Sequence, residues 1–286
     1  MSASVTRQAH AKANLFLRVL GREADGYHSL ETLFCRLELA DTLTAERGEG
    51  RGVTLTVDGL ECGPIEQNLA RRAAEAVLQL VRVPFGVRLT LHKRIPVGAG
   101  LGGGSADAAA ALAAVNQLAE HSVPRAELFH LAARLGADVA FCFSEASLAL
   151  AWGRGERLML LPALPSAPVL LVTPAAPVRT AQAYGWLDEA RSGTIRRGAL
   201  ALDGAALAGW SDVARMAGND FESVVFGRLP QVREAFEALA RTGPLLCRMT
   251  GSGSTLLAVY RTERGRDDAR MALGKKHGAV TPTRTL

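Results

Sequence analysis

The chain has 286 residues, of which 48% are hydrophobic and 21% charged. This length accommodates one large or two moderate domains, and the composition excludes a largely disordered chain. The net charge of +5 at pH 7 suits an anionic ligand, but it also suits an ordinary basic surface. Lysines and arginines do not cluster with aromatic residues, so no nucleic-acid partner is expected.

Neither a membrane span nor a secretory signal is expected. The apolar segment that comes nearest to the roughly 18 residues of a span is interrupted by Pro162, Pro165 and Pro168. The first ten residues lack the apolar stretch of a signal peptide. The four cysteines form no CxxC pair, so neither a disulfide framework nor a cysteine metal site is expected. These features predict a cytoplasmic protein without a membrane partner.

The first half of the chain mixes predicted strands and helices. Asn68 is a plausible N-cap of the first helix, and Gly136 ends another. Apolar spacing predicts helices over 68–82, from Ser105 to about Glu120, and from 122 to 136. Alternation and β-branched composition predict strands over 8–20, 30–39, 53–59, 86–95, 139–143 and 147–152.

The proline-rich segment near 160–168 is the best candidate for a domain boundary, which divides the chain into residues 1–160 and 161–286. A polar loop is expected over 191–199. Beyond the boundary we expect a strand over 168–174, helices over 181–190, 229–242 and 266–274, and a strand-turn-strand over 246–260. The expected fold class is therefore α+β in two halves.

Five glycines lie between Gly98 and Gly104, where a predicted strand ends and an alanine-rich helix begins. The first amides of a helix have no intrahelical acceptor, and the helix dipole adds partial positive charge there. Glycines let the backbone approach a bulky anion closely. A flexible connection or tight packing would account for one such glycine, but this density favours a phosphate-binding loop.

Two common phosphate-binding loops fit this segment poorly. A Walker loop needs a lysine after its glycines, and none follows here. Gly98, Gly100 and Gly103 satisfy the dinucleotide pattern GxGxxG, which makes a Rossmann fold the second choice. The acidic residue of that motif should end a second strand, whereas Glu120 ends a long helix and another helix follows.

The segment PVGAGLGGGSADAAAAL (96–112) resembles the glycine motif of the GHMP kinases, which are small-molecule kinases unrelated to the Walker-type enzymes. AKANLFLRVLGREADGYHSLETLF (11–34) is similar to the amino-terminal signature of one member family, the 4-diphosphocytidyl-2-C-methyl-D-erythritol kinases. MTGSGSTLLAVY (249–260) resembles the carboxy-terminal glycine motif of the superfamily. LGADVAFCF (135–143) and NDFESVV (219–225) extend the likeness over nearly the whole chain.

The resemblance implies a two-domain GHMP kinase fold, with a ribosomal-protein-S5-domain-2-like ATP-binding domain and a ferredoxin-like carboxy-terminal domain. It also implies ATP-dependent phosphorylation of the 2-hydroxyl of 4-diphosphocytidyl-2-C-methyl-D-erythritol, with Mg²⁺, in non-mevalonate isoprenoid synthesis. We expect a monomer or weak homodimer. Two alternatives remain, namely a GHMP kinase with another acceptor and a nucleotide-binding module without catalysis.

By the same resemblance Asp138 and Lys12 are the catalytic residues. Asp138, the aspartate of GADV, would accept the proton of the acceptor hydroxyl. Lys12 would balance the charge of Asp138 and of the reacting oxygens. On the residues alone, Asp138 equally suits a cap or turn and Lys12 an edge strand. Arginine outnumbers lysine 29 to four in this chain, so a lysine in an apolar segment is informative.

The expected nucleotide contacts gather around the glycine loop. Lys93 would face either the nucleotide or solvent, and the Ser105 hydroxyl would cap the helix, contact phosphate or ligate Mg²⁺. No carboxylate metal ligand is assigned. The resemblance places the nucleotide against Asn68, Lys93, Pro96, Val97, Gly98, Ala99, Gly100, Leu101, Gly102, Gly103, Gly104, Ser105 and Ala106.

The acceptor is expected to contact aromatic side chains. Tyr27 and Tyr184 would stack on the cytosine while His28 reads its edge, and Asn14 and Thr180 would contact the rest of the molecule. A turn tyrosine with a core-filling partner is the competing interpretation. The turn TGSGST (250–255) would bind phosphate or the methylerythritol group, or serve as a plain hairpin turn. The chain departs from the family pattern at Ala13, Ala106 and Ala140, which affects packing and not the proposed reactive groups.

Overall fold

The computed structural model describes residues 4–83, 85–191 and 207–286, so most of the loop predicted over 191–199 lies outside the described residues. The chain forms two compact units that interleave along the sequence. Unit 1 comprises Met1–Lys12, Leu39–Val97 and Gly102–Glu145, and unit 2 comprises Ala13–Glu38, Gly98–Leu101 and Ala146–Leu286.

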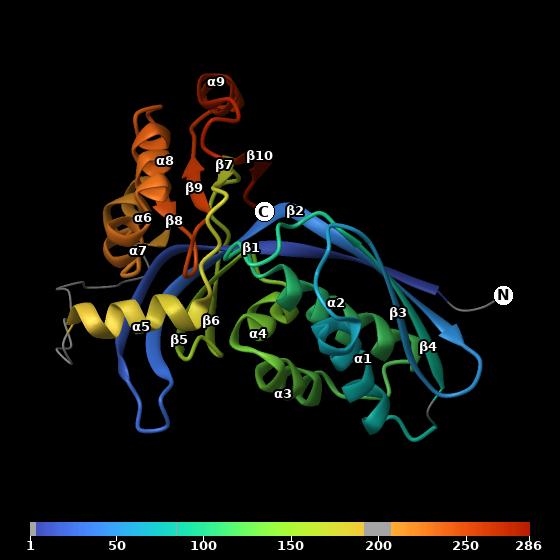
Figure 1. Cartoon of the computed structure of the whole chain (residues 1–286). Coiled ribbons are helices and arrows are strands. Elements are labelled where there is room, and N and C mark those ends of the chain that lie inside the picture. Colours follow the sequence, from blue (N-terminus) through green and yellow to red (C-terminus); the bar gives the residue numbers. More distant parts are fainter. Residues whose placement is uncertain (1–3, 84, 192–206) are drawn as a thin grey trace. The chain divides into compact units, whose positions relative to one another are not determined.

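Unit 1 combines a sheet with helices packed on it (Figure 1). Its elements are β3 (Gly52–Gly59), the 3₁₀ helix η1 (Ile65–Gln67), α1 (Leu69–Leu80), β4 (Gly86–Lys93), α2 (Gly103–Leu118), α3 (Arg125–Leu135) and α4 (Ala137–Ser144), with the first part of β1 (Ser4–Arg22) and the last part of β2 (His28–Gly48). Strand β4 pairs in parallel with β3 and antiparallel with β2.

The side chains of β4 alternate between the two faces of the sheet, as a strand requires. Leu89 and Leu91 are fully buried, whereas Arg88, Thr90 and His92 are exposed. The same alternation places Lys93 on the buried face, one position before the chain turns toward the glycine loop. A charged residue therefore occupies the last core position of this strand.

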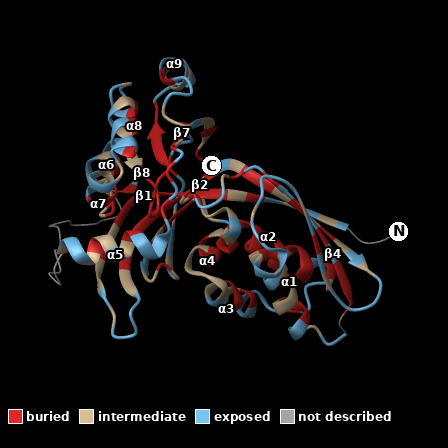
Figure 2. Cartoon of the chain, in the orientation of Figure 1, coloured by how far each residue is buried: buried red, intermediate tan, exposed pale blue. Residues whose placement is uncertain are grey.

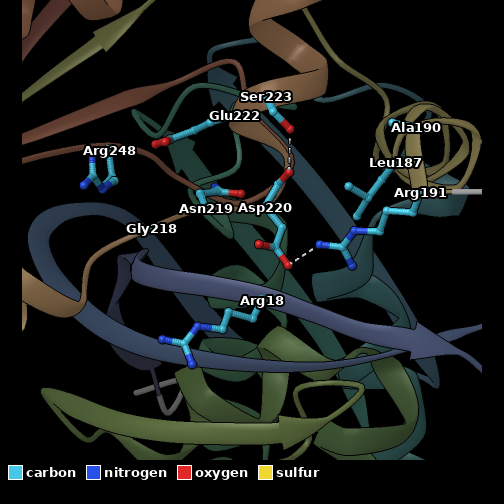
Figure 3. Close-up of a pocket in the computed structure, with 10 residues that line it drawn as sticks. All are labelled: Arg18, Leu187, Ala190, Arg191, Gly218, Asn219, Asp220, Glu222, Ser223 and Arg248. Atoms are coloured by element: carbon cyan, nitrogen blue, oxygen red, sulfur yellow. Dashed lines mark hydrogen bonds and ion pairs between the residues drawn. The ribbon is translucent and has the colours of Figure 1, made fainter. Parts of the chain in front are cut away.

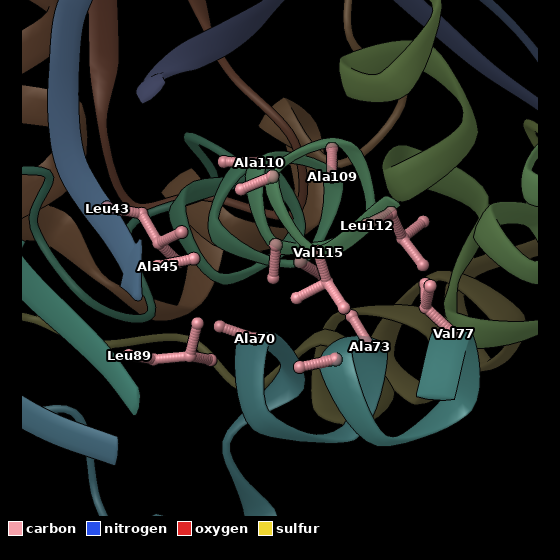
Figure 4. Packing of buried hydrophobic residues seen from close by; sticks show 14 of the residues in the cluster. Leu43, Ala45, Ala70, Ala73, Val77, Leu89, Ala109, Ala110, Leu112 and Val115 are labelled. Atoms are coloured by element: carbon pink, nitrogen blue, oxygen red, sulfur yellow. The ribbon is translucent and has the colours of Figure 1, made fainter. Parts of the chain in front are cut away.

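Helices α1 and α2 pack closely because small side chains line both of them. Ala70 and Ala73 of α1 lie beside Val115 of α2, and Leu89 of β4 lies next to them (Figure 4). Helix α2 is buried on almost every side (Figure 2), which its alanine-rich sequence permits. Interiors packed at this density tolerate little change in volume. The first turn of α2 is thereby held firmly against the sheet.

Unit 2 contains an antiparallel sheet in the order β10-β7-β9-β8, flanked by helices (Figure 1). Leu170 and Val172 of its central strands form a core with Leu256 and Ala258. The first part of β2 also belongs to unit 2 and pairs with β5. The elements are β5 (Leu148–Gly153), β6 (Arg157–Leu161), β7 (Pro168–Thr173), α5 (Thr180–Arg191), α6 (Trp210–Met216), α7 (Glu222–Arg228), α8 (Pro230–Ala240), β8 (Leu246–Met249), β9 (Leu256–Val259), α9 (Glu263–Leu273) and β10 (Ala279–Arg284).

The predicted α+β composition is confirmed, and most predicted elements are present with ends that differ by a few residues. The strand predicted over 139–143 is wrong, because those residues belong to helix α4. A short apolar run does not distinguish a buried strand from a buried helix, and Val139, Ala140, Phe141 and Phe143 are all buried here. Strands β6 and β10 and helices α6 and α7 were not predicted.

The start predicted for α2 at Ser105 is also wrong. The helix begins at Gly103, and its N-cap is Gly102 in the left-handed region at φ 67°. Ser105 therefore lies inside the first turn, and no side chain caps this helix. Among the described residues, no helix is both long and apolar enough to cross a membrane.

Candidate active site

Lys12 and Asp138 form an ion pair within unit 1, with Nζ and Oδ2 3.1 Å apart. Lys12 comes from β1 and its side chain is only 5% exposed, whereas Asp138 is 34% exposed. Asp138 lies in the first turn of α4, where the helix dipole favours a negative charge. The pair thus presents a reachable carboxylate whose position is fixed by a buried ammonium.

The stem of Lys12 also lies against the start of α2. A Cβ atom on Gly102 would come within 2.7 Å of Lys12 Cγ and 3.0 Å of Cε, so a larger residue at position 102 would displace the lysine. The left-handed φ of Gly102 independently favours glycine there. Lys12 therefore lies between the beginning of the glycine-rich helix and Asp138.

The amides of Gly103, Gly104 and Ser105 form the open end of α2. The first intrahelical bond runs from Ala106 N to Gly102 O at 2.9 Å, so the three preceding amides have no intrahelical acceptor. Gly104 is exposed, and a Cβ there would meet only Leu69 Cδ1, at 3.8 Å. These features are those of an anion site at a helix N-terminus.

Lys93 lies beneath that helix start in a buried cluster with two acids. Its Nζ is 2.5 Å from Asp41 Oδ2 and 2.7 Å from Asp107 Oδ2. The three side chains are 2%, 0% and 3% exposed. We call Lys93, Asp41 and Asp107 the Lys93 cluster. The prediction that Lys93 faces the nucleotide or solvent does not describe this structure, because its ammonium faces two buried carboxylates.

Asp107 is the member of the Lys93 cluster whose carboxylate is not fully hydrogen-bonded. Its Oδ1 is one of the few buried side-chain atoms of the described residues without a hydrogen-bond partner. Burial raises the pKa of Asp107, Lys93 lowers it and the neighbouring Asp41 raises it, and the net effect is a pKa of about 7. Two acids and one base leave the cluster one negative charge in excess when all are ionised.

The other residues expected at the nucleotide differ in exposure. Val97 and Gly98 are exposed and Pro96 is half-buried, whereas Ala99, Leu101 and Ala106 are buried and contribute packing. The N-cap prediction for Asn68 is confirmed, because its Oδ1 accepts from Ala70 N at 2.9 Å. Its Nδ2 lies 3.4 Å from Cys62 Sγ.

In unit 2, the first part of the glycine loop packs directly on the carboxy-terminal glycine turn. A Cβ on Gly100 would lie 2.4 Å from Thr250 O, and a Cβ on Gly251 would lie 3.1 Å from Gly100 Cα. Asn14 fixes the same turn, since its Oδ1 accepts from Gly251 N at 3.0 Å and its backbone N donates to Thr250 Oγ1 at 3.0 Å. Asn14 is only 3% exposed.

Helix α5 carries two expected acceptor residues, Thr180 and Tyr184, and the unpredicted Asp188 on one face at intervals of four. Thr180 Oγ1 lies 3.2 Å from Ser252 Oγ in the glycine turn. One turn later, the Tyr184 ring stacks on His28 with centroids 4.4 Å apart. After a further turn, Asp188 Oδ1 lies 2.8 Å from His28 Nε2. The structure thus stacks Tyr184 on His28.

Tyr27 is 61% exposed and packs against Arg154, whose Cζ lies 4.1 Å from the centre of its ring. Arg154 also binds Glu23 Oε2 at 2.6 Å and the Asp25 carboxylate, so it holds the turn between β1 and β2. We call Arg154, Glu23 and Asp25 the Arg154 cluster.

Several residues that organise these sites were not predicted from the sequence. Asp188 follows Tyr184 by four residues, a helical spacing that brings the two onto one face. Asn219, within the quoted NDFESVV, donates from Nδ2 to Met249 O and Gly251 O, both at 2.8 Å. No sequence signal pointed to Arg154 or Asp41.

A cavity of about 590 Å³ in unit 2 lies beside Asn219 (Figure 3). Arg191 and Asp220 form an ion pair at 2.6 Å along its wall, and Arg18 and Arg248 add two more cations. Its described lining residues include none of those predicted for catalysis or for substrate binding.

Two family profiles match this chain. The profile for the GHMP kinases N terminal domain matches residues 68–145, and that for the GHMP kinases C terminal matches residues 201–279. A 4-diphosphocytidyl-2-C-methyl-D-erythritol kinase from Moorella thermoacetica is 41% identical over 99% of both chains. The kinase of the same name from Solibacter usitatus is 40% identical, over 90% of this chain and 83% of its own length.

A crystal structure of 4-(cytidine 5'-diphospho)-2C-methyl-D-erythritol kinase matches with a TM-score of 0.82 and 35% identity, covering 98% of this chain and 99% of the other. Fold, glycine loop and ion pair thus agree with a small-molecule kinase of the GHMP class. The chain belongs to the GHMP kinases and, within them, to the 4-diphosphocytidyl-2-C-methyl-D-erythritol kinase family. The family and fold expected from the sequence are confirmed.

Proposed function

We propose that this enzyme transfers the γ-phosphate of ATP to the 2-hydroxyl of 4-diphosphocytidyl-2-C-methyl-D-erythritol, a step of non-mevalonate isoprenoid synthesis. The observation that carries this proposal is the 41% identity over 99% of both chains with the kinase of that name from Moorella thermoacetica. The ion pair of Lys12 and Asp138, 3.1 Å apart beside the start of α2, supports the same chemistry.

In this mechanism Asp138 accepts the proton of the acceptor hydroxyl. The hydroxyl oxygen forms a bond to the γ-phosphorus while the bond from that phosphorus to the β–γ bridging oxygen breaks, so ADP leaves with that electron pair. The proton then passes from Asp138 to solvent. Lys12 stabilises the negative charge that develops on the reacting oxygens, and its burial restricts the directions it can point.

The amides of Gly103, Gly104 and Ser105 bind the phosphates of ATP in this proposal, with residues 96–102, Asn68 and Ala106 shaping the nucleotide site. ATP enters as its Mg²⁺ complex, and the ion offsets phosphate charge. The described residues contain no group of three or more His, Cys, Asp or Glu side chains that could hold a metal ion. An ion bound mainly by phosphates and water needs only one or two protein oxygens.

The acceptor binds to residues of unit 2 in this proposal. Tyr184 and Tyr27 supply flat surfaces for the cytosine, and His28, oriented by Asp188 at 2.8 Å, reads its edge. Thr180 lies beside the turn that contains Ser252 and contacts the polar part of the acceptor. Asn14 shapes that turn through Gly251.

We further propose that the enzyme works in the cytoplasm on small molecules, as a monomer or weak homodimer, without a nucleic-acid or membrane partner. The four cysteines form no disulfide with one another, which agrees with a reducing compartment.

The test is an acceptor panel with Mg·ATP, in which ADP release and the phosphorylated product are both measured. We expect turnover with 4-diphosphocytidyl-2-C-methyl-D-erythritol and a background rate with homoserine, mevalonate or no acceptor. Turnover with homoserine or mevalonate alone would overturn the assignment of the acceptor. ATP binding without phosphate transfer to any acceptor would identify a nucleotide-binding module instead.

A further inference from the structure

The Lys93 cluster has no role in the reaction described above, although it is the most deeply buried group of charges in unit 1. Its members come from three elements: Asp41 from β2, Lys93 from β4 and Asp107 from α2. Removing charges from water is costly, and apolar residues of similar volume often stabilise a fold as well or better. A deeply buried cluster of three ionisable groups is therefore poorly explained by stability alone.

Asp41 connects the cluster to the segment that enters the glycine loop. Its Oδ1 accepts from the backbone amides of Arg94 and Ile95, at 2.5 Å and 2.8 Å, while its Oδ2 faces Lys93. These two residues directly precede Pro96, where the loop begins. One carboxylate therefore fixes both the end of β4 and the orientation of the lysine.

Lys93 connects the cluster to the first turn of α2. A Cβ on Gly103 would lie 3.2 Å from Lys93 Nζ and 3.0 Å from Ile95 Cγ2, so the backbone of this residue rests on the cluster. Asp107 lies one turn further along the same helix and accepts from Lys93 at 2.7 Å. The Lys93 ammonium therefore contacts the first turns of α2 at two places, the backbone of Gly103 and the carboxylate of Asp107.

We propose that Lys93, Asp41 and Asp107 are positioning residues that hold the entry of the glycine loop and the first turn of α2 in the geometry that binds phosphate. Lys93 acts through the amides of Gly103 to Ser105 and does not touch the nucleotide, since its side chain is 2% exposed and faces two carboxylates. This inference rests on the proposed binding of ATP at the start of α2.

The first test uses two variants that change the cluster in different ways. Asp107→Asn removes one carboxylate and leaves the pair of Lys93 and Asp41. Lys93→Arg keeps the charge but places a larger, planar group against Gly103. We expect both variants to raise the Kd and the KM for ATP about tenfold, while the KM for the acceptor is unchanged.

The matched control is Asp220→Asn, which removes the carboxylate of the ion pair with Arg191 in unit 2. It should lower the melting temperature but change the Kd for ATP less than about twofold. If the cluster variants are destabilised like the control and bind ATP like the wild type, the cluster is only structural and the proposal is overturned. A Lys93→Arg variant that binds ATP normally but has no turnover would also overturn the proposal, because Lys93 would then be a catalytic residue.

A second test uses the wild-type enzyme and does not depend on how the variants fold. An acyl-phosphate derivative of ATP acylates amines close to the bound phosphates, and the labelled lysine is identified by mass spectrometry. We expect labelling of Lys12, which lies beside Gly102. Labelling of Lys93 would overturn the proposal. ATP binding and labelling need no acceptor, so a failure of the acceptor assignment is distinguished from a failure of this inference.

Discussion

Two clusters of this molecule contain the same kinds of charge, one cation and two carboxylates, in opposite surroundings. In the Lys93 cluster no side chain is more than 3% exposed. In the Arg154 cluster the side chains are between 35% and 53% exposed. The first cluster supports the proposed phosphate site, and the second supports the tyrosine proposed to bind the acceptor base.

The surroundings of each charge cluster, and not its number of partners, decide what the cluster does. Burial raises the pKa of Asp107 to about 7 even though a lysine lies beside it. In the exposed cluster, hydrogen bonding to Arg154 holds the pKa of Asp25 below its ordinary value. Breaking a buried cluster leaves a charge without solvent, whereas water replaces a lost partner at the surface. We therefore expect a change in the Lys93 cluster to have a larger effect than a change in the Arg154 cluster.

The pair of Lys12 and Asp138 lies between these extremes, with one buried and one accessible partner. For Asp138→Ala we expect turnover to fall at least about 100-fold while ATP affinity stays nearly intact, because the proton acceptor is lost but the phosphate-binding amides remain. Single-turnover kinetics and ATP titration measure the two quantities. A variant that retains more than about a tenth of wild-type turnover would remove Asp138 from the proton-transfer step.

The Lys93 cluster predicts a pH dependence of stability. Folded Asp107 keeps its proton up to about pH 7, whereas an aspartate of the unfolded chain loses its proton at about pH 3.9. Between these values the folded state binds more protons, so this group's stabilisation, complete at low pH, is lost as the pH rises toward 7. Denaturant unfolding should show that the free energy of unfolding of the wild type falls relative to that of Asp107→Asn over this range. A constant difference between the two proteins would contradict the prediction.

The smallest effect is expected at the Arg154 cluster. For Arg154→Ala we expect the KM for the cytidine-containing acceptor to rise about two- to fivefold, because Tyr27 loses the cation packed on its ring, with the KM for ATP unchanged. High salt should raise the same KM in the wild type, since screening weakens exposed pairs. Arg157→Ala is the matched control, a neighbouring arginine that is 68% exposed and pairs only with Glu156 among the described residues. Equal effects of the two variants would show that Tyr27 does not depend on Arg154.

The sequence predicted the elements with strong periodicity and the motifs with distinctive spacing. The glycine loop, the family and the helix after Asn68 all followed from local pattern. The burial of Lys93 could also have been predicted from the sequence, because the alternation of β4 assigns position 93 to the same face as Leu89 and Leu91. Lys93 was instead expected to face either the nucleotide or solvent.

Other features depend on contacts that no local pattern contains. Asp41 meets Lys93 across 52 positions of the chain, and Arg154 meets Glu23 across 131. Helix α4 was mistaken for a strand because its short apolar run is buried on every side, which removes the periodicity that separates the two structures. The start of α2 at Gly103 depends on a left-handed glycine that caps the helix without a side chain.

The contact between Gly100 and the turn at Thr250 and Gly251 has a consequence for protein engineering. Gly100 and the turn at Thr250 and Gly251 meet through main-chain atoms, so no substitution on one side can make room for a larger side chain on the other. Residues 98–101 and 250–251 therefore have to be exchanged together. Chimeric enzymes that exchange one of these segments with a relative should retain function only when the donor also carries glycine at both meeting points.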